Sequence, residues 1–329
     1  MRAKIRIADV ARAAGVSTAT VSRALSDPGK VGAETRAKVL AAIEATGYRV
    51  NGAARDLRQQ RARSILVLAP NLANTFFSRI VAAIQEVAGA TGLAVQVSDT
   101  RARQETLWTL GHDGRADGLI VLDGSLPATM VRGWRLPTVQ LCELNPAYGV
   151  PGLGIDNAAA AGLAVDHLAD LGYRSILHVA GPPQNVLSGA REAGFRSAAV
   201  RRGLAHVVLE GDFTLESGIR AARDWAQMAD RPAAVFTASD ECAFGFISEC
   251  HRMGLSVPKD ASVVGFDDVD FAGHFTPPLT TIHQPRARLG RLAAERLVAA
   301  LQQDVPMQLQ QELIDAHLVI RGSTARREV

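Results

Sequence analysis

The chain has 329 residues, 47% of them hydrophobic, so it can bury sizeable cores, and its length predicts two or three domains. No apolar run has signal-peptide length or the ~20 residues of a membrane span, which predicts a cytoplasmic globular protein with no membrane partner.

The charged residues are distributed unevenly along the chain. Residues 1–63 hold thirteen Lys and Arg against five Asp and Glu, a net +8, whereas the remaining 266 hold 23 basic and 28 acidic residues, a net −5. The basic segment is expected to meet a polyanion. A solubilising basic tail is the alternative, but the segment is patterned rather than low in complexity.

The basic segment predicts three helices. Residues 5–13 (IRIADVARA) carry apolar side chains at helical spacing, and Gly15 ends that helix because glycine adopts left-handed angles cheaply. Ser17 is a good N-cap for the second helix, STATVSRAL. A third helix spans about 33–46. Two short helices joined by a tight glycine-containing turn indicate a helix-turn-helix.

The second helix supplies candidate DNA contacts. A recognition helix turns its N-terminal residues toward base edges, which here are Thr18, Ala19 and Arg23. Arg23 can fork onto the O6 and N7 atoms of a guanine. The alternatives are that Arg23 is an ordinary exposed residue and that Ser17 is only a cap. Phosphate contacts, which set register without reading sequence, are expected from Ser17, Thr20 and Ser22.

IADVARAAGVSTATVSRALSDPGKV, together with TGYRVNGAARDLR, strongly resembles the bacterial LacI family of transcriptional regulators. The resemblance implies a hinge helix that folds on operator DNA, pairs with its dimer mate and wedges a leucine into the minor groove. Such a wedge unstacks a base step and kinks the duplex. The run Tyr48-Arg49-Val50-Asn51 lacks the proline common in the family after this tyrosine. The matching hinge residues are Leu57 for the wedge and Ala54, Arg55 and Arg58 around it.

From Ser64 onward short apolar runs alternate with helical stretches, which predicts parallel sheets. Two such series indicate an α/β body of two doubly wound subdomains, whose ligands bind beyond the carboxyl ends of strands. The first series has strands at 64–70, 93–99, 117–124 and 138–141, with helices near 76–91 and 104–114. After the Pro- and Gly-rich stretch 146–154, the second has strands at 175–181, 206–213, 233–239 and 262–268, with helices at 157–171, 190–202, 215–229 and 241–253. The predicted domains are a helix-turn-helix domain (1–49), a hinge helix and linker (50–63), and an effector-binding and dimerisation domain (64–329).

Polar and aromatic side chains after these strands predict a small-molecule pocket. Asp267 and Arg191 would clamp the hydroxyls of a sugar-like ring, and phenylalanines would stack on it. The phenylalanine pair at 76–77 could equally be plain core, and Asp156 could only cap the helix that follows it. The candidate effector residues are Phe76, Phe77, Asp156, Arg191, Phe213, Ser239, Asp240, Asp267 and Gln284.

The resemblance to the LacI family extends over the body, where NTFFSRI, GIDNAAAAG, HVAGPP, GDFTLESG, VGFDD and FTPPLTTIHQP stand in the family's order. It implies a body similar to periplasmic sugar-binding proteins that dimerises and couples effector binding to the hinge. The cytidine and purine repressors are the most similar branch. The run Gln184-Asn185-Val186-Leu187 does not keep the purine repressors' ligand-reading residues, which favours a nucleoside or sugar-like effector over a nucleobase.

These observations predict a homodimeric regulator, most simply a repressor, of a pseudo-palindromic operator in double-stranded DNA. An enzyme is not expected, because the chain has no GxxxxGK[ST] loop, GxSxG elbow or HExxH helix. The three cysteines are scattered and no Cys or His beside them has zinc-site spacing, so neither a disulfide framework nor a metal is expected, and no cofactor. The alternative function is a small-molecule binding protein, cytoplasmic or of periplasmic type, without a transcriptional role.

Overall fold

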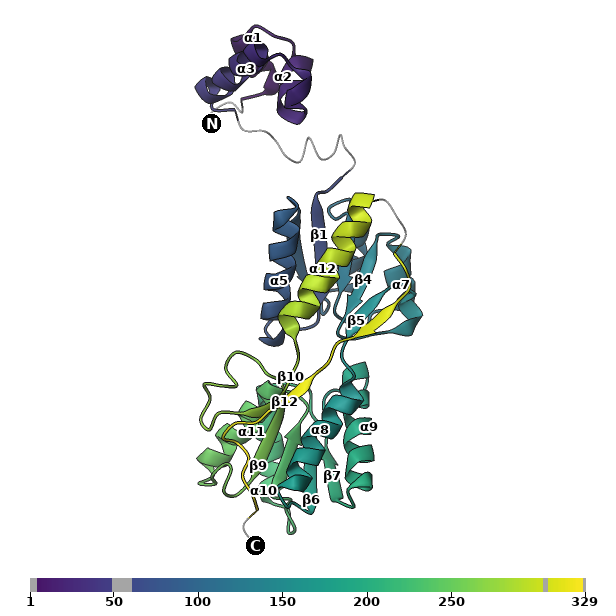
Figure 1. Ribbon diagram of the computed structural model, residues 1–329, viewed down its shortest axis with the longest axis vertical. Coiled ribbons are helices and arrows are strands. Elements are labelled where there is room, and N and C mark those ends of the chain that lie inside the picture. Colours follow the sequence, from purple (N-terminus) through teal and green to yellow (C-terminus); the bar gives the residue numbers. More distant parts are fainter. Residues whose placement is uncertain (1–4, 49–60, 304–306, 328–329) are drawn as a thin grey trace. The chain divides into compact units, whose positions relative to one another are not determined.

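The computed structural model describes residues 5–48, 61–303 and 307–327 (Figure 1). The chain divides into two compact units, Met1–Gln60 and Arg61–Val329, which are called the head and the body and are treated separately. Most of the predicted hinge, including Ala54, Arg55, Leu57 and Arg58, lies outside the described residues. Within them, no helix has both the length and the apolar character to cross a membrane.

The head is a three-helix unit around a small apolar core. Its helices are α1 (Ile7–Ala14), α2 (Thr18–Ser26) and α3 (Ala33–Thr46), with a short 3-10 turn at Pro28–Lys30. These bounds agree with the predicted helices to within two residues. Each helix contributes at least one fully buried apolar side chain to the core, which holds Val10, Ala11, Val21, Ala24, Val39 and Ala42.

The body consists of two lobes, each a six-stranded sheet with helices on both faces (Figure 1). In lobe 1 the strand order is β11-β5-β4-β3-β1-β2. Alternate residues of β1 point to opposite faces, so Ile65 packs in the cluster that contains α5 and α12, and Leu66 in the cluster that contains α6 and α7. Lobe 1 comprises β1 (Ser64–Ala69), α5 (Phe76–Ala90), β2 (Ala94–Asp99), α6 (Gln104–His112), β3 (Gly118–Val121), α7 (Ala128–Gly133), β4 (Thr138–Leu141), a 3-10 turn (Pro146–Tyr148), β5 (Gly152–Gly154), α12 (Arg286–Gln303) and β11 (Gln311–Leu313).

Lobe 2 repeats the arrangement with the order β12-β10-β9-β8-β6-β7. Ile176 of β6 packs on the side of α8 and α9, and its neighbour Leu177 packs with α10 and α11. Lobe 2 comprises α8 (Asn157–Asp170), β6 (Ser175–Val179), α9 (Val186–Arg201), β7 (Ala205–Leu209), α10 (Leu215–Ala226), β8 (Ala234–Thr237), α11 (Asp240–Arg252), β9 (Ser262–Asp267), β10 (Thr280–His283) and β12 (His317–Val319).

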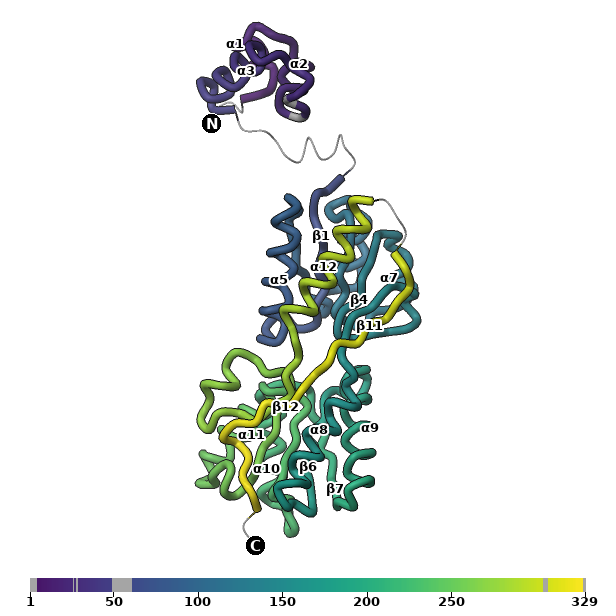
Figure 2. The backbone as a smooth tube through the Cα atoms, in the orientation of Figure 1, coloured from purple at the N-terminus to yellow at the C-terminus, as the bar shows by residue number. Residues whose placement is uncertain are grey.

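The chain passes between the lobes three times: after β5, after β10 and between β11 and β12. Figure 2 shows the last passage as the yellow C-terminal segment that runs from one lobe to the other.

The prediction of two wound sheets is confirmed, with one correction: β12 is antiparallel to β10, so the second sheet is not wholly parallel. The sequence patterns predict no element beyond residue 268, where the structure has β10, α12, β11 and β12.

His178 is a titratable group in the core of lobe 2. Its ring is fully buried and stacks between Phe195 and Phe236, with centroid distances of 4.9 and 4.7 Å. Nδ1 donates to the carbonyl oxygen of Phe236 at 3.0 Å, and Nε2 has no partner among the described residues. Burial lowers the pKa of His178 to about 4, so the folded protein holds this ring neutral.

Acid is therefore expected to destabilise the body through His178. Its pKa is lower in the folded state, so its contribution is present above pH 6.5 and is lost as the pH falls toward 4. The difference between the ordinary histidine pKa of 6.5 and the folded-state pKa of about 4 corresponds to about 3 kcal/mol in the free energy of unfolding. Urea unfolding of the parent and of His178→Phe at pH 7.5 and 5 measures this difference. The exposed His251→Gln should keep the parental pH dependence. If His178→Phe lost as much stability as the parent between pH 7.5 and 5, His178 would not be the group responsible.

Candidate functional sites

The turn between α1 and α2 fixes the start of the candidate recognition helix. Gly15 adopts a left-handed φ of 66°, and its N–H bonds back to the carbonyl oxygens of Ala11 and Arg12. After this turn, Ser17 caps α2: its Oγ accepts from the N–H of Thr20 at 3.1 Å and lies 2.9 Å from the Thr20 hydroxyl. Ser17 is thus the predicted cap, and the residue is exposed.

One face of α2 is buried and the other is free of the head's core. Val21 and Ala24 pack inward, whereas Thr18, Ala19 and Arg23 are exposed or half-buried outside that core. The first turn of α2 carries no acidic residue that would repel a phosphate. The structure therefore leaves the predicted base-reading residues outside the core; the predicted phosphate contacts Ser17, Thr20 and Ser22 are likewise exposed or half-buried.

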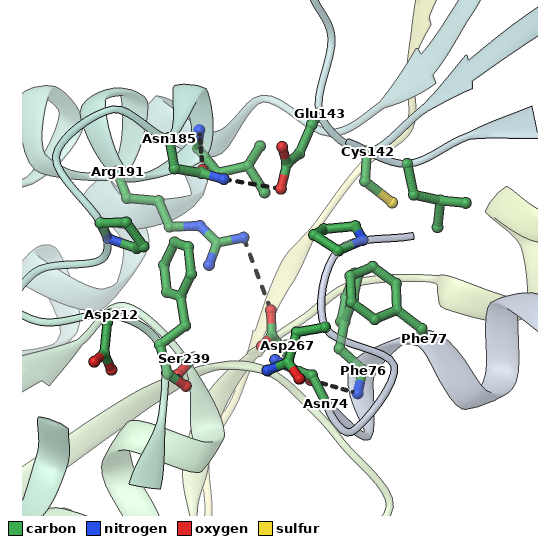
Figure 3. Close-up of a pocket in the computed structure, with 16 residues that line it drawn as sticks. Asn74, Phe76, Phe77, Cys142, Glu143, Asn185, Arg191, Asp212, Ser239 and Asp267 are labelled. Carbon is green, nitrogen blue, oxygen red and sulfur yellow. Dashed lines mark hydrogen bonds and ion pairs between the residues drawn. The ribbon is translucent and has the colours of Figure 1, made fainter. Parts of the chain in front are cut away.

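A cavity lies between the two lobes of the body (Figure 3). Its volume is about 170 Å³, about tenfold more than the ~10–15 Å³ that one water needs, so it is built for a larger molecule. Its lining residues follow the carboxyl ends of strands in both lobes, where ligands of open α/β sheets bind. Lobe 1 contributes Pro70, Asn71, Asn74, Phe76, Phe77, Leu122, Cys142 and Glu143, and lobe 2 contributes Pro182, Asn185, Leu187, Arg191, Asp212, Phe213, Ser239 and Asp267.

Arg191 and Asp267 are the buried charged pair of lobe 2, with exposed fractions of 3% and 6%. Nη2 of Arg191 lies 3.8 Å from Oδ1 of Asp267, and the guanidinium stacks 3.7 Å above the Phe266 ring. Gln284 donates from Nε2 to Asp267 Oδ1 at 2.7 Å. Burial raises the pKa of Asp267, and the nearby guanidinium offsets part of this rise. A carboxylate and a guanidinium side by side present both acceptors and donors to a polyhydroxylated ligand.

The cavity holds residues in costly backbone conformations. Four of its non-glycine residues have positive φ, namely Asn71 (53°), Cys142 (66°), Phe213 (66°) and Asp267 (120°). Such conformations cost of order 1–3 kcal/mol each and gather at functional sites. Their concentration in one cavity supports its assignment as the ligand site.

Aromatic rings wall the cavity from both lobes. Phe76 and Phe77 of α5 meet edge to face at 5.2 Å, and both line the cavity. On the opposite lobe, the backbone oxygen of Phe213 accepts from Ser239 Oγ at 2.8 Å. A Cβ on Gly181 would come within 2.2 Å of the Phe213 ring, so the absent side chain leaves room for this ring.

Glu143 is the main site residue that the sequence analysis misses. It is 5% exposed; Oε2 accepts from the N–H of Gly124 and Oε1 from Asn185 Nδ2, both at 2.9 Å. Asn185 belongs to lobe 2, so this bond joins the lobes. Burial raises the pKa of Glu143 to about 6. Its position directly after the 138–141 strand is the signal that could have identified it.

Three predicted effector residues do not line the cavity. Asp156 caps α8 by accepting from the N–H of Ala159, the alternative that the sequence left open. Asp240 is fully buried beneath the site, where it accepts from the N–H of Val269 and the hydroxyl of Thr281. Gln284 holds Asp267 from the passage between the lobes, so it is a positioning residue. The other predicted residues, Phe76, Phe77, Arg191, Phe213, Ser239 and Asp267, are brought together at the cavity.

Comparison with known proteins identifies the family. Residues 6–51 match the bacterial regulatory proteins of the lacI family, and residues 165–324 match a periplasmic binding protein-like domain. The chain is 37% identical to the HTH-type transcriptional repressor CytR of Escherichia coli strain K12, over 96% of this chain and 95% of that protein. It is 34% identical to the repressor PurR of Photobacterium profundum, over 89% of this chain and 90% of that one.

Solved structures of LacI-family regulators are also similar to this chain. The lac repressor dimer bound to operator and the anti-inducer ONPF matches with a TM-score of 0.85 and 31% identity, over 98% of this chain and 99% of that chain. The regulator CelR in complex with cellobiose gives 0.73 and 28%, over 97% and 99%. A LacI family regulator from Enterococcus faecium with bound ribose gives 0.75 and 26%, over 80% and 100%.

The chain belongs to the LacI family of bacterial transcriptional regulators: it is a DNA-binding repressor with a periplasmic binding protein-like domain. The predicted family, fold and function class are therefore confirmed. Because the family consists of transcriptional repressors, membership also agrees with the prediction that the chain is not an enzyme and decides against a binding protein without a transcriptional role.

Replacing Arg23 with Ala should cost about 1–3 kcal/mol of binding at a specific site and relax base choice at one position, because the predicted forked base contact would be lost. Arg36→Ala removes the same charge from α3 and should weaken binding only slightly and uniformly. Fluorescence anisotropy against a site and its single-base variants measures both. A uniform loss for Arg23→Ala would make it a phosphate contact instead.

Gly181→Ala should destabilise the body by about 1–3 kcal/mol, since the new Cβ displaces the Phe213 ring. Gly189→Ala is the matched control: it lies in α9 with nothing within 4 Å of its Cβ position, and should stabilise by about 0.5–1 kcal/mol. Urea unfolding distinguishes the two, and equal effects would show that Phe213 moves aside freely.

Proposed function

We propose that this protein is a ligand-controlled repressor whose operator binding responds to a sugar- or nucleoside-like effector in the cavity between the lobes. The observation that carries the proposal is that one chain joins a helix-turn-helix head to a buried, polar and aromatic cavity walled by both lobes. Its relatives support the effector class, since their structures hold cellobiose and ribose.

On the DNA side, we propose a homodimer that places two α2 helices in successive major grooves of a pseudo-palindromic operator, in the cytoplasm, where bacterial DNA lies. The lac repressor, a relative of 31% identity, binds operator as a dimer. The hinge residues Ala54, Arg55, Leu57 and Arg58 remain predicted contacts, with Leu57 as the minor-groove wedge. The domain boundaries at residues 49 and 63 remain predictions as well.

On the ligand side, Asp267 and Arg191 would bind hydroxyl groups while Phe76, Phe77 and Phe213 cover the apolar faces of a ring. Effector binding would bias the arrangement of the lobes and so the pairing of the hinges. A coupling of this kind is worth about 1–3 kcal/mol in typical allosteric proteins.

The test begins with selecting bound fragments from a genomic library and measuring operator affinity against a panel of nucleosides, nucleobases and monosaccharides. We expect a two-fold symmetric site and an effector that changes affinity by about fivefold to 150-fold. Asp267→Asn should abolish the response and spare operator binding, because the head is a separate compact unit. The exposed Asp230→Asn should respond like the parent. A full response in Asp267→Asn would place the effector elsewhere, and absence of operator binding by the parent would refute the proposal.

A further inference from the structure

Glu143 is an unusual member of the cavity wall because it is a buried acid that pairs with no cationic side chain in the described parts of the protein. Figure 3 shows its carboxylate directed toward Asn185 across the lobe boundary. Within residues 5–48, 61–303 and 307–327, no Lys, Arg or His nitrogen lies within 4.0 Å of its oxygens. A buried carboxylate of this kind is costly unless it is paired and hydrogen-bonded.

The other acids of the cavity do not share this condition. Asp267 faces Arg191 at 3.8 Å. Asp212 is exposed at the rim, where Arg220 Nη2 lies 3.2 Å from its carboxylate. Each has a cationic neighbour, whereas the donors to Glu143 in the described part of the chain, Gly124 and Asn185, are neutral. The carboxylate of Glu143 thus accepts hydrogen bonds from two neutral donors and forms no ion pair with a described residue.

The cavity is also poorly equipped to bind a phosphate. Its single guanidinium, on Arg191, already donates from Nε to Asn157 and from Nη1 to the carbonyl oxygen of Ala238, besides facing Asp267. Anions are commonly held by open helix N-termini or free arginine forks. Here Asn185 accepts from the N–H groups of Leu187 and Ser188 at the start of α9, and Ser239 accepts from that of Cys242 at the start of α11.

We infer that the cavity takes an uncharged or cationic, unphosphorylated ligand, and that Glu143 is a specificity-determining residue that accepts a hydrogen bond from an N–H or O–H group of that ligand. The inference rests on the proposed function and narrows its effector class. It excludes sugar phosphates and nucleotides, because a dianion would face the carboxylates of Glu143 and Asp267 with one guanidinium between them.

The geometry gives Glu143 capacity for such a bond. An ionised carboxylate accepts about four hydrogen bonds, and protein donors use one site on each oxygen of Glu143. A ligand donor bound there would contact lobe 1 directly and lobe 2 through Asn185. A hydrogen bond to a charged group is worth more than one to a neutral group, so this contact would contribute strongly to specificity.

The first arm of the test compares matched compounds by isothermal titration calorimetry with the full-length protein. The pairs are ribose and ribose 5-phosphate, glucose and glucose 6-phosphate, cytidine and its 5′-monophosphate, and adenosine and its 5′-monophosphate. We expect at least one unphosphorylated member to bind and its phosphorylated partner to bind about 100-fold more weakly. Equal or tighter binding of the phosphorylated member overturns the inference, as does failure of every unphosphorylated compound to bind at millimolar concentration.

The second arm substitutes the residue. Glu143→Gln should weaken the bound compound roughly tenfold to 100-fold. The ligand-free variant should melt within about 3 °C of the parent or above it, since an amide avoids the cost of the buried charge. Glu210→Gln, an exposed acid outside the cavity, should change neither value. Loss of affinity together with a large drop in melting temperature would make Glu143 structural, and unchanged affinity would remove it from the site.

Failure of this inference is distinguishable from failure of the proposed function. An operator response to a phosphorylated sugar or nucleotide would overturn the inference and leave ligand-controlled repression intact. A protein that binds unphosphorylated compounds through Glu143 but binds no operator would refute the proposed function alone.

Discussion

Strand direction is the constraint on which the body depends. Ten of its twelve strands pair only in parallel, and β10 and β12 make the single antiparallel ladder among the described residues. Parallel strands end at one edge of their sheet, so the loops that follow them gather there. Three passages of the chain between the lobes bring the two loop edges to one cavity, to which both lobes contribute (Figure 3). The site therefore depends on the topology of two sheets and not on any one sequence motif.

Within that frame, Asp267 connects the cavity to the segment that joins the lobes. It faces Arg191 on one side, and on the other accepts from Gln284, which directly follows β10 on the way to α12. Asp240 lies beneath the site, and Thr281 of β10 donates to it. Burial and proximity to Asp267 raise the pKa of Asp240 well above its usual range. A ligand that contacts Asp267 thus touches a residue in direct contact with an interlobe passage.

The sequence predicts the fold well where a helix or strand is long enough to show its pattern. It predicts the site residues where the rule that ligands bind at strand ends is sufficient. Most strands of the alternating series stand out as short apolar runs bounded by helical stretches, whereas β5, β11 and β12 have three residues each, too few to form such a run. The strand-end rule finds Arg191 and Asp267, and applied after 138–141 it would have indicated Glu143. It fails at Asp156 because a helix cap and a ligand contact both place a carboxylate at a helix start.

Polar contacts between the lobes set the free energy that a ligand must match. They include Asn185 to Glu143, Thr75 to Glu241, the Arg79–Asp270 ion pair, and the bonds from Arg286 to Asp268 and Asp270. The ion pair has exposed fractions of 60% and 51%, so solvent and salt screen it and it contributes little. The hydrogen bonds contribute about 0.5–1.5 kcal/mol each, somewhat more where a carboxylate accepts. A ligand that adds two or three bonds across the same boundary supplies free energy of the same order, and a ligand shifts a conformational equilibrium only by its differential affinity for the two states. Two or three hydrogen bonds to a ligand would therefore match the interlobe hydrogen bonds in size.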